Sequence, residues 1–343
     1  MKPDDGSNAG WPHAEELREQ DSKGGFWSND NKKLLVEFLK FLAVIAVGVY
    51  ALKNFAADIA IVTNKNFQDL HKAAVAVSVE IKSSANSVAD ATIYELDGSQ
   101  DDSRVLIKLK ADNPQIVISL GVYAAKMTRQ ALPEATIIYT SVRYPECENF
   151  TSDKKMIGIM ASGSEEVLAK LVSSFTAGRT DFASAKKIAV MYSDFLEPSV
   201  KPMIEKLKQA GLDPKPMPLS EAPLLELVMQ DISNSYQSLL LIPDKTTTNE
   251  PSLRFILTRC MEKRVLTFSL DYSLVEKGVL CGVFTKPEEC VSYAAVVARN
   301  ILASGKLPAQ NVLTPPKVYT VMNQAASKYM GAAPNLTTDF KIE

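Results

Sequence analysis

Histidine is almost absent from this sequence. Only His13 and His71 occur in 343 residues, and neither lies in a metal-ligand spacing, which excludes a zinc or iron site built on several histidines. A Ser-His-Asp triad would need His71, which lies within a predicted helix and is expected to be solvent-exposed. The motifs GxSxG, GxxxxGK(S/T) and GxGxxG are also missing. The sequence therefore predicts no catalytic residue, no metal and no cofactor.

Cysteine is scarce as well. The four cysteines, Cys147, Cys260, Cys281 and Cys290, form no CxxC pair, which argues against a zinc ribbon or a thioredoxin-like motif. Two interpretations stay open. The four can be reduced, largely buried thiols, or an oxidising compartment can pair them in up to two disulfides.

The sequence also lacks an excess of positive charge. Lys and Arg number 38 against 40 Asp and Glu, so the net charge is −2, which argues against a nucleic-acid partner. The composition is otherwise that of a globular protein, with 46% hydrophobic and 23% charged residues. A chain of 343 residues exceeds the usual size of one core, so we expect two lobes.

The first part of the chain has the pattern of an export or anchoring segment. Residues 1–32 are polar and predict a disordered tail, and residues 33–57 predict a signal peptide or a membrane-anchor helix. The unbroken apolar run Phe41–Leu52 is shorter than a membrane span, and extending it to 34–52 includes Glu37 and Lys40. Three alternatives remain: a cleaved signal, a retained anchor at 34–52 in the inner membrane, or a buried amphipathic helix. The first two predict a periplasmic or other extracytoplasmic location.

From residue 58 onward, short β-branched runs alternate with helical segments, a pattern typical of parallel α/β sheets. One series runs through the strands predicted at 59–63, 91–96, 115–120 and 136–140, and a second through those at 186–192, 238–242, 265–270 and 279–284. The expected fold class is therefore α/β, with two doubly wound parallel-sheet lobes joined by a hinge. We expect lobe 1 to comprise 58–184 plus 286–343, and lobe 2 to comprise 185–285, with the crossing at 176–185.

Ligands of open parallel sheets bind beyond the carboxyl ends of the strands, which directs attention to the residues that follow each strand. These are hydroxyls, amides, carboxylates and aromatics, a set that suits a small polar molecule. The helix after Gly121 could hold a carboxylate, Asp271 an ammonium group, and a tyrosine could stack on the ligand. Each residue also has an alternative role as a helix cap or turn former. The candidate ligand-binding residues are Thr63, Asn64, Ser119, Gly121, Thr140, Ser141, Tyr144, Tyr192, Ser193, Asp244, Asp271 and Tyr272.

The sequence also resembles a known family. The segments IAIVTN, PQIVISLGVYAAKM and EATIIYTSV, followed by KKIAVMYS, SLLLIPD and VLTFSLDYSLVEKGVLCGVF, are similar in order and spacing to the substrate-binding proteins of ABC importers. The resemblance is strongest to the group with tryptophan- and tyrosine-binding lipoproteins, and covers roughly residues 58–334. It implies a type I periplasmic-binding fold, whose two lobes are joined by three crossings and close over a ligand.

Three features depart from the family pattern. Arg143-Tyr144-Pro145-Glu146 follows TSV where the family commonly has Asp-Pro, Asp194-Phe195-Leu196 replaces an Asn-Ser-like turn, and the lipobox is missing. The resemblance implies a non-enzymatic solute-binding protein of an ABC-type importer, with a permease as partner and an amino acid as one candidate ligand. The alternative is a membrane-anchored sensory or scaffold subunit with the same domain. An enzyme on this fold is a third hypothesis.

Overall fold

The computed structural model describes residues 36–40, 58–83, 90–160, 164–177 and 180–342. The chain divides into two units, 1–56 and 57–343. Residues 36–40 of the first unit are helical, and the remainder of the predicted tail and of the predicted signal or anchor segment lies outside the described residues. No helix among the described residues is both long enough and apolar enough to cross a membrane. The second unit contains two α/β lobes.

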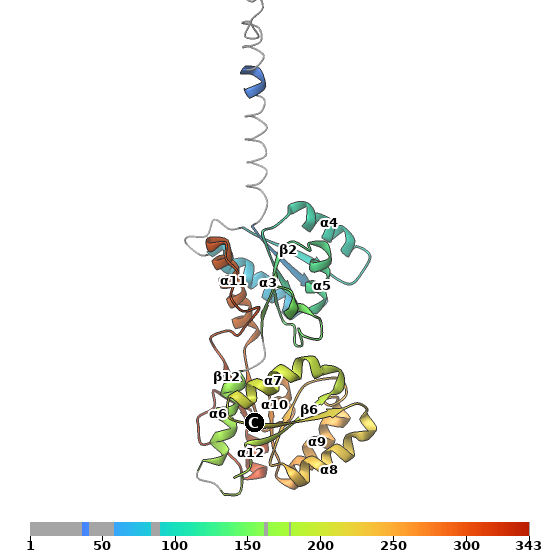
Figure 1. Cartoon of the computed structure of the whole chain (residues 1–343), viewed down its shortest axis with the longest axis vertical. Coiled ribbons are helices and arrows are strands. Elements are labelled where there is room, and N and C mark those ends of the chain that lie inside the picture. The colour runs from blue at the N-terminus through green and yellow to red at the C-terminus, as the bar shows by residue number, and fades with distance from the viewer. Residues whose placement is uncertain (1–35, 41–57, 84–89, 161–163, 178–179, 343) are drawn as a thin grey trace, which may run out of the picture. The chain divides into compact units, whose positions relative to one another are not determined.

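Lobe 1 is built on a six-stranded sheet in which every pair of neighbouring strands is parallel. The strand order is β11 (Val312–Leu313), β5 (Met156–Ile159), β4 (Thr136–Thr140), β3 (Ile116–Leu120), β1 (Ile59–Asn64), β2 (Ala91–Leu96). Helices α3 (Gln68–Ser83) and α11 (Pro287–Ser304) bury one face, and α4 (Asp102–Asp112) and α5 (Val122–Ala131) bury the other. Figure 1 shows α11 beside α3 although they lie far apart in the sequence.

Lobe 2 is built on a seven-stranded sheet that is parallel except where β10 meets β12. The strand order is β13 (Phe340–Ile342), β12 (Tyr319–Asn323), β10 (Cys281–Phe284), β9 (Leu266–Ser269), β8 (Ser238–Leu241), β6 (Lys187–Ser193), β7 (Asp213–Leu219). The helices are α6 (Glu165–Thr176), α7 (Glu197–Gln209) and α12 (Gln324–Met330) on one face, and α8 (Leu225–Ser235), α9 (Glu250–Lys263) and α10 (Tyr272–Glu276) on the other. Short 3-10 turns, η1 (Phe150–Ser152), η2 (Asp194–Leu196) and η3 (Ala222–Leu224), complete the two lobes.

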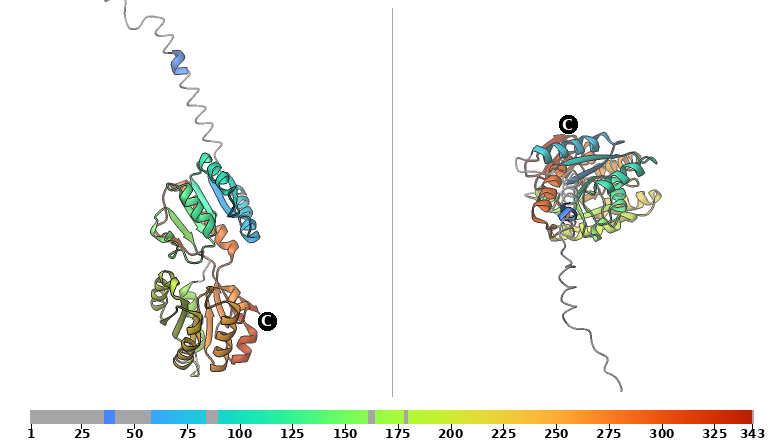
Figure 2. Two further views of the ribbon diagram at one scale, coloured as in Figure 1. Left: turned by 90° about the vertical axis from the view of Figure 1, so that its right-hand side faces the viewer. Right: turned by 90° about the horizontal axis from the view of Figure 1, so that it is seen from above.

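The chain passes between the lobes three times: from β5 to α6, from β10 to α11 and from β11 to β12. Figure 2 shows orange segments running between the lobes. This division differs from the expected one. Helix α6 packs in the core of lobe 2 through Leu168 and Phe175, and β12 and β13 extend the second sheet, whereas the expected boundaries assign all three to lobe 1.

Of the segment expected to cross, residues 176–185, the part from 180 to 185 belongs to lobe 2, because Phe182 and Ala185 are buried in its core. Its hydrophilic composition reflects a surface turn before β6. The crossing before α6 is instead marked by Ser164, which caps the helix by accepting a hydrogen bond from the backbone N–H of Val167 (3.3 Å).

Candidate functional site

The carboxyl ends of the two sheets lie at the junction between the lobes. The segment that follows β4 at its carboxyl end contacts lobe 2 at three places: the turn after β8, the turn after β9, and the η2–α7 region that follows β6. The β10–α11 crossing also leaves from a carboxyl end. The candidate residues of both lobes are therefore gathered at one junction, as parallel-sheet topology predicts.

In lobe 1, two buried threonines lie near the carboxyl ends of β1 and β4, on the same face of the sheet and with β3 between the two strands. Ile59 and Ile61 of β1 and Ile138 of β4 pack against α3 and α11. Because side chains alternate along a strand, Thr63 and Thr140 continue on this face. Both are fully buried; the Thr63 hydroxyl has no hydrogen-bond partner among the described residues, and the Thr140 hydroxyl has none there apart from the neighbouring Cys290 thiol. An unpartnered buried hydroxyl costs about 1–3 kcal/mol, so an oxygen of this kind is a candidate contact for a ligand.

Cys290, in the first turns of α11, lies beside Thr140. Its thiol donates to the Met160 carbonyl at 3.7 Å, and the Thr140 hydroxyl is near enough to influence its titration. Burial raises the pKa of the Cys290 thiol to about 12, the Thr140 hydroxyl acting in the opposite direction. The thiol is therefore protonated at neutral pH and is a weak donor rather than a nucleophile.

A third buried hydroxyl comes from the crossing itself. Thr285 follows β10, is 3% exposed, and its Oγ1 has no hydrogen-bond partner among the described residues. It was absent from the candidates predicted from the sequence. The same signal would have found it, since it directly follows the strand predicted at 279–284.

The remaining candidate residues of lobe 1 make local hydrogen bonds or adopt special backbone conformations near the ends of the strands. Ser119 donates to the Thr128 hydroxyl of α5 (3.2 Å), and the Asn64 side chain accepts from the backbone N–H of Asn66 (2.9 Å). Gly121 has φ +91° and precedes α5, whose first turn has no side-chain cap in the described part of the chain. A side chain at Gly121 would be strained by this φ and would approach Leu70 at 3.3 Å. Ser141 is exposed, with φ +59°.

Asp244 of lobe 2 organises the turn after β8. Its carboxylate accepts from the backbone N–H and hydroxyl of Ser193 (3.1 and 2.8 Å), from the backbone N–H of Thr246 (2.6 Å), and from the backbone N–H and hydroxyl of Thr247 (both 2.7 Å). These bonds join the carboxyl ends of β6 and β8. Asp244 and Ser193 are therefore partners of each other before any ligand is considered.

Asp271 is engaged in two directions. One carboxylate oxygen caps α10 by accepting from the backbone N–H (2.8 Å) and hydroxyl (2.7 Å) of Ser273. The other lies 2.5 Å from the Arg143 guanidinium of lobe 1. The sequence marks Arg143 as a departure from the family pattern in the segment after the strand at 136–140, and its partner is on the opposite lobe.

The three candidate tyrosines have different surroundings. Tyr144 packs on the core of lobe 2, and its hydroxyl donates to the Pro243 carbonyl; burial raises its pKa. Tyr192 is 4% exposed within the core of lobe 2, and burial raises its pKa as well. The Tyr272 ring lies 4.8 Å from the Phe284 ring, in an aromatic cluster with Tyr319 and Phe340. Only Tyr144 bridges the lobes.

No cluster of three or more His, Cys, Asp or Glu side chains in the described ranges is arranged to hold a metal ion. What the junction offers is hydroxyls, backbone N–H groups of α5 and one cross-lobe ion pair. These groups can hydrogen-bond a polar molecule and complement its charge.

Comparisons with known proteins find similarity of structure alone. No protein-family model matches the chain, and neither does any curated protein. Among solved structures, a ligand-free, open substrate-binding protein with adhesive properties from Clostridium difficile matches with TM-score 0.63 and 15% identity, over 83% of this chain and 98% of that one. The ABC domain in complex with L-Trp from Streptococcus pneumonia matches with TM-score 0.54 and 14% identity, over 83% and 99%.

A conserved domain protein from Vibrio cholerae matches with TM-score 0.53 and 16% identity, over 84% of this chain and 100% of that one. Each match spans nearly the whole partner chain and both lobes of this one. The two-lobed α/β architecture predicted from the sequence is confirmed: residues 58–342 have the type I periplasmic-binding fold of substrate-binding proteins.

Proposed function

We propose that this chain is a solute-binding protein that holds a small polar molecule at the junction between its two lobes. The observation that carries the proposal is a set of three buried hydroxyls: those of Thr63 and Thr285, which have no hydrogen-bond partner in the described part of the chain, and that of Thr140, which has only the weakly bonding Cys290 thiol beside it. They come from three different segments that end at the junction. A ligand that accepts or donates hydrogen bonds there would remove the cost of leaving these groups unpaired.

The first turn of α5, which has no cap among the described side chains, suggests that the ligand carries a negatively charged group. Backbone N–H groups at a helix N-terminus favour negative charge, and Gly121 leaves room for close approach. Asp271, held near Arg143, gives the opposite side of the junction both signs of charge. A zwitterion such as an amino acid fits this arrangement, and the proposed finer role is therefore delivery of such a molecule to an ABC permease from an extracytoplasmic location.

The proposal contains no catalytic step. The buried Cys290 thiol is protonated, and the Asp244 carboxylate is occupied by five hydrogen bonds that hold its own turn. Neither group is free to act as a nucleophile or a base in this conformation.

Thermal-shift screening of the full-length protein against amino acids, sugars and other small metabolites tests the proposal. We expect at least one polar compound to raise the melting temperature in a concentration-dependent way. Positive compounds are then titrated by calorimetry, which should give one site per chain. A library that includes the aromatic amino acids and yields no shift would contradict the proposed function.

The second candidate is a membrane-anchored sensory or scaffold subunit. The side-chain contacts between the lobes favour it, because a domain already held together can report its state to a partner. Amino-terminal sequencing of the native protein separates the two. A mature chain that starts near residue 58 supports a free binding protein, whereas an intact residue 1 supports an anchored subunit.

A further inference from the structure

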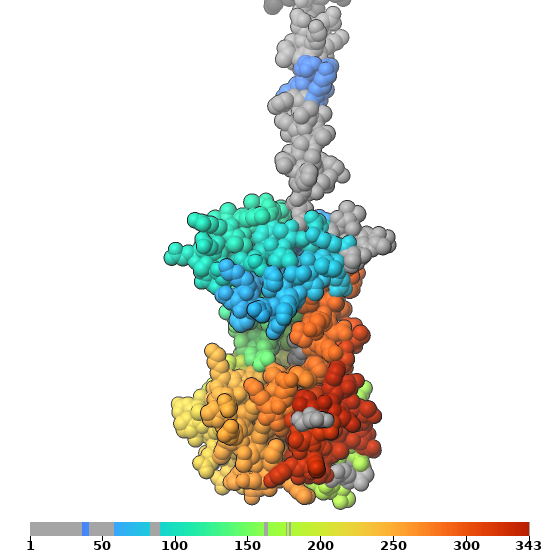
Figure 3. All heavy atoms as spheres, turned by 180° about the vertical axis from the view of Figure 1, so that it is seen from behind, coloured from blue at the N-terminus to red at the C-terminus, as the bar shows by residue number. Residues whose placement is uncertain are grey.

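The segment between β4 and β5 contains a five-residue tip, Arg143–Cys147, that belongs to lobe 1 by sequence and touches lobe 2 with most of its side chains. In Figure 3 the green surface of this part of the chain lies at the junction with lobe 2. The tip also holds all four residues, 143–146, that stand where the family resemblance implies an Asp-Pro pair. Its contacts show what the replacement does.

Four tip side chains contact lobe 2. The Arg143 guanidinium lies 2.5 Å from Asp271 Oδ2, and the Tyr144 hydroxyl donates to the Pro243 carbonyl. Glu146 accepts from the Ser199 hydroxyl at 2.7 Å. The Cys147 sulfur lies 3.4 Å from that same hydroxyl and 3.7 Å from the Phe195 carbonyl oxygen.

These contacts reach three separate elements of lobe 2: the turn after β8, the turn after β9, and the start of α7 with η2. The Tyr144 and Cys147 side chains also pack against the hydrophobic core cluster of that lobe. A surface loop in incidental contact with its neighbour would not bond to three elements and also pack against a hydrophobic core. The tip is therefore seated on lobe 2.

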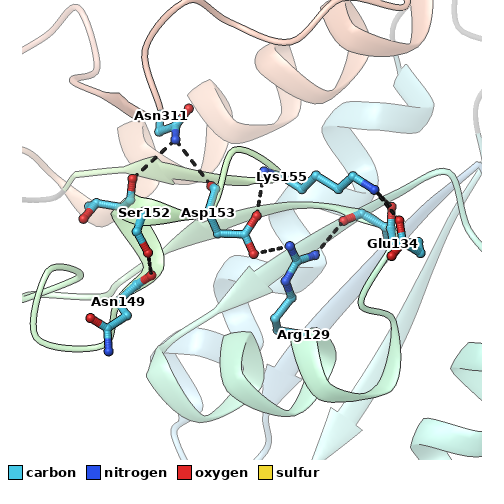
Figure 4. A network of polar contacts seen from close by, with 9 residues as sticks. Arg129, Glu134, Asn149, Ser152, Asp153, Lys155 and Asn311 are labelled. Carbon is cyan, nitrogen blue, oxygen red and sulfur yellow. Dashed lines mark hydrogen bonds and ion pairs between the residues drawn. The ribbon is translucent and has the colours of Figure 1, made fainter.

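The base of the same segment is fixed to lobe 1 (Figure 4). The Asp153 carboxylate pairs with Arg129 of α5 and accepts from the backbone N–H of Lys155 at 2.9 Å. Lys155 in turn pairs with Glu134 at 2.6 Å. Asn311 donates to the carbonyl oxygens of Thr151 and Asp153, both at 3.4 Å. With its base fixed to one lobe and its tip seated on the other, the segment couples the two.

We propose that Arg143–Cys147 is an interlobe latch, a built-in contact that holds the two lobes together in the absence of solute. The latch acts in parallel with the three covalent crossings. Since the lobes can separate only when its contacts break, removing them raises the population of separated lobes.

The latch also affects the proposed binding site. The groups it occupies on lobe 2, the Asp271 carboxylate and the Pro243 carbonyl, lie at the strand ends where a solute would be held. A solute that uses either group must displace the latch. Its apparent affinity is therefore the intrinsic affinity multiplied by the fraction of molecules in which the latch is open. This second statement rests on the proposed function, whereas the latch itself does not.

The test measures lobe separation without any solute. Spin labels are attached through a keto-bearing unnatural amino acid, which leaves the native thiols untouched, at the exposed positions Lys110 in α4 and Glu226 in α8. Pulsed electron resonance then gives the distance distribution between the lobes. The comparison is between the wild-type chain and the triple variant Arg143→Ala/Tyr144→Phe/Ser199→Ala.

We expect the triple variant to populate long interlobe distances about tenfold more than the wild type. The contacts that it loses should together change the equilibrium constant for lobe separation by about a factor of ten. Arg143→Lys should stay close to the wild type, since it keeps the charge opposite Asp271. The control Arg259→Ala removes an ion pair that lies wholly within α9 and should change nothing. Tyr144→Phe alone, which keeps the packed ring, should give a smaller shift in the same direction.

An unchanged distribution in both the triple variant and Tyr144→Phe would overturn the latch. So would a shift of equal size in Arg259→Ala, because the response would then be non-specific. The outcome is separate from that of the screening experiment. A shifted distribution together with no solute found supports the latch and counts against the proposed function.

Discussion

The two lobes satisfy the polar groups at their strand ends in different ways. In lobe 2, Ser193 and Asp244 bond to each other and to their own turns, and Asp271 caps a helix. In lobe 1, Thr63 and Thr140 are buried at the equivalent edge, with no partner for either hydroxyl among the described residues apart from the Cys290 thiol beside Thr140. The comparison indicates that the ends of β6 and β8 in lobe 2 are organised in advance by their own hydrogen bonds, whereas the ends of β1 and β4 in lobe 1, like Thr285 after β10, keep unused hydrogen-bonding capacity.

The largest expected effect comes from breaking the organisation of lobe 2. Asp244→Ala leaves the donors of Ser193, Thr246 and Thr247 without their acceptor, and should lower the free energy of unfolding by about 3 kcal/mol. Chemical denaturation measures the change.

Asp69→Ala is the matched control, because that carboxylate is 98% exposed and its substitution should change stability by no more than about 0.5 kcal/mol. Similar losses in both variants would show that the hydrogen bonds of Asp244 do not distinguish the turn after β8 from an ordinary surface position.

The corresponding substitutions in lobe 1 should not lower the free energy of unfolding. Thr63→Val and Thr140→Val replace a buried hydroxyl with no partner among the described residues, or with only a thiol beside it, by a methyl group of similar size, and each should leave stability unchanged or raise it by up to about 1 kcal/mol. Thermal and chemical denaturation of the protein without added solute give the values.

Ser193→Ala is the matched variant in lobe 2 and should destabilise by about 1 kcal/mol, because it removes the hydroxyl bonded to Asp244. If the two threonine variants lose as much as Ser193→Ala, the hydroxyls of Thr63 and Thr140 have structural partners and the comparison between the lobes fails.

The smallest effect tests Glu165, a carboxyl of lobe 2 whose surroundings disfavour its charge. Burial raises the pKa of Glu165 at the start of α6, although Lys206 acts in the opposite direction. A raised carboxyl pKa means that the folded state favours the protonated form, so the contribution to stability is lost as pH rises through the folded-state value. Glu165→Gln should therefore be more stable than the wild type at about pH 8, with the difference vanishing near about pH 4.

The neighbouring Glu166 is the internal control. The Ser164 hydroxyl lowers the pKa of Glu166, so its contribution to stability is present at neutral pH and lost on acidification. Glu166→Gln should thus be less stable than the wild type at about pH 8. Denaturation curves at several pH values that move both variants in the same direction would contradict the assignment.

The sequence predicts most of the architecture because both lobes are built from strongly patterned α/β units. The strands predicted at 136–140 and 91–96 agree with β4 and β2 to the residue. The elements that the sequence did not predict include two very short strands and one helix. β11 and β13 have two and three residues, too few for a pattern, and their place is set by the neighbouring strand. Helix α6 was overlooked because the hydrophilic stretch after it resembled a crossing.

The candidate site was predictable to a different extent. Reading the residues after each strand located Thr63 and Thr140, because parallel topology alone brings strand ends together. The same procedure could not tell which groups were already satisfied. Asp244 and Ser193 bond across a sequence separation that no local pattern reveals, and Tyr192 points into a core because of strand parity. The partner of Arg143 depends on the approach of the other lobe, which the sequence does not show.

The central claim is that a solute binds at the junction through the buried hydroxyls of lobe 1. The most direct test is a calorimetric titration of the best compound from the screen into the wild-type chain and into the Thr63→Val/Thr140→Val variant. The account predicts one site per chain in the wild type and a dissociation constant at least about tenfold higher in the variant, whose stability should be equal to or higher than that of the wild type. Equal affinity in the two proteins would contradict it.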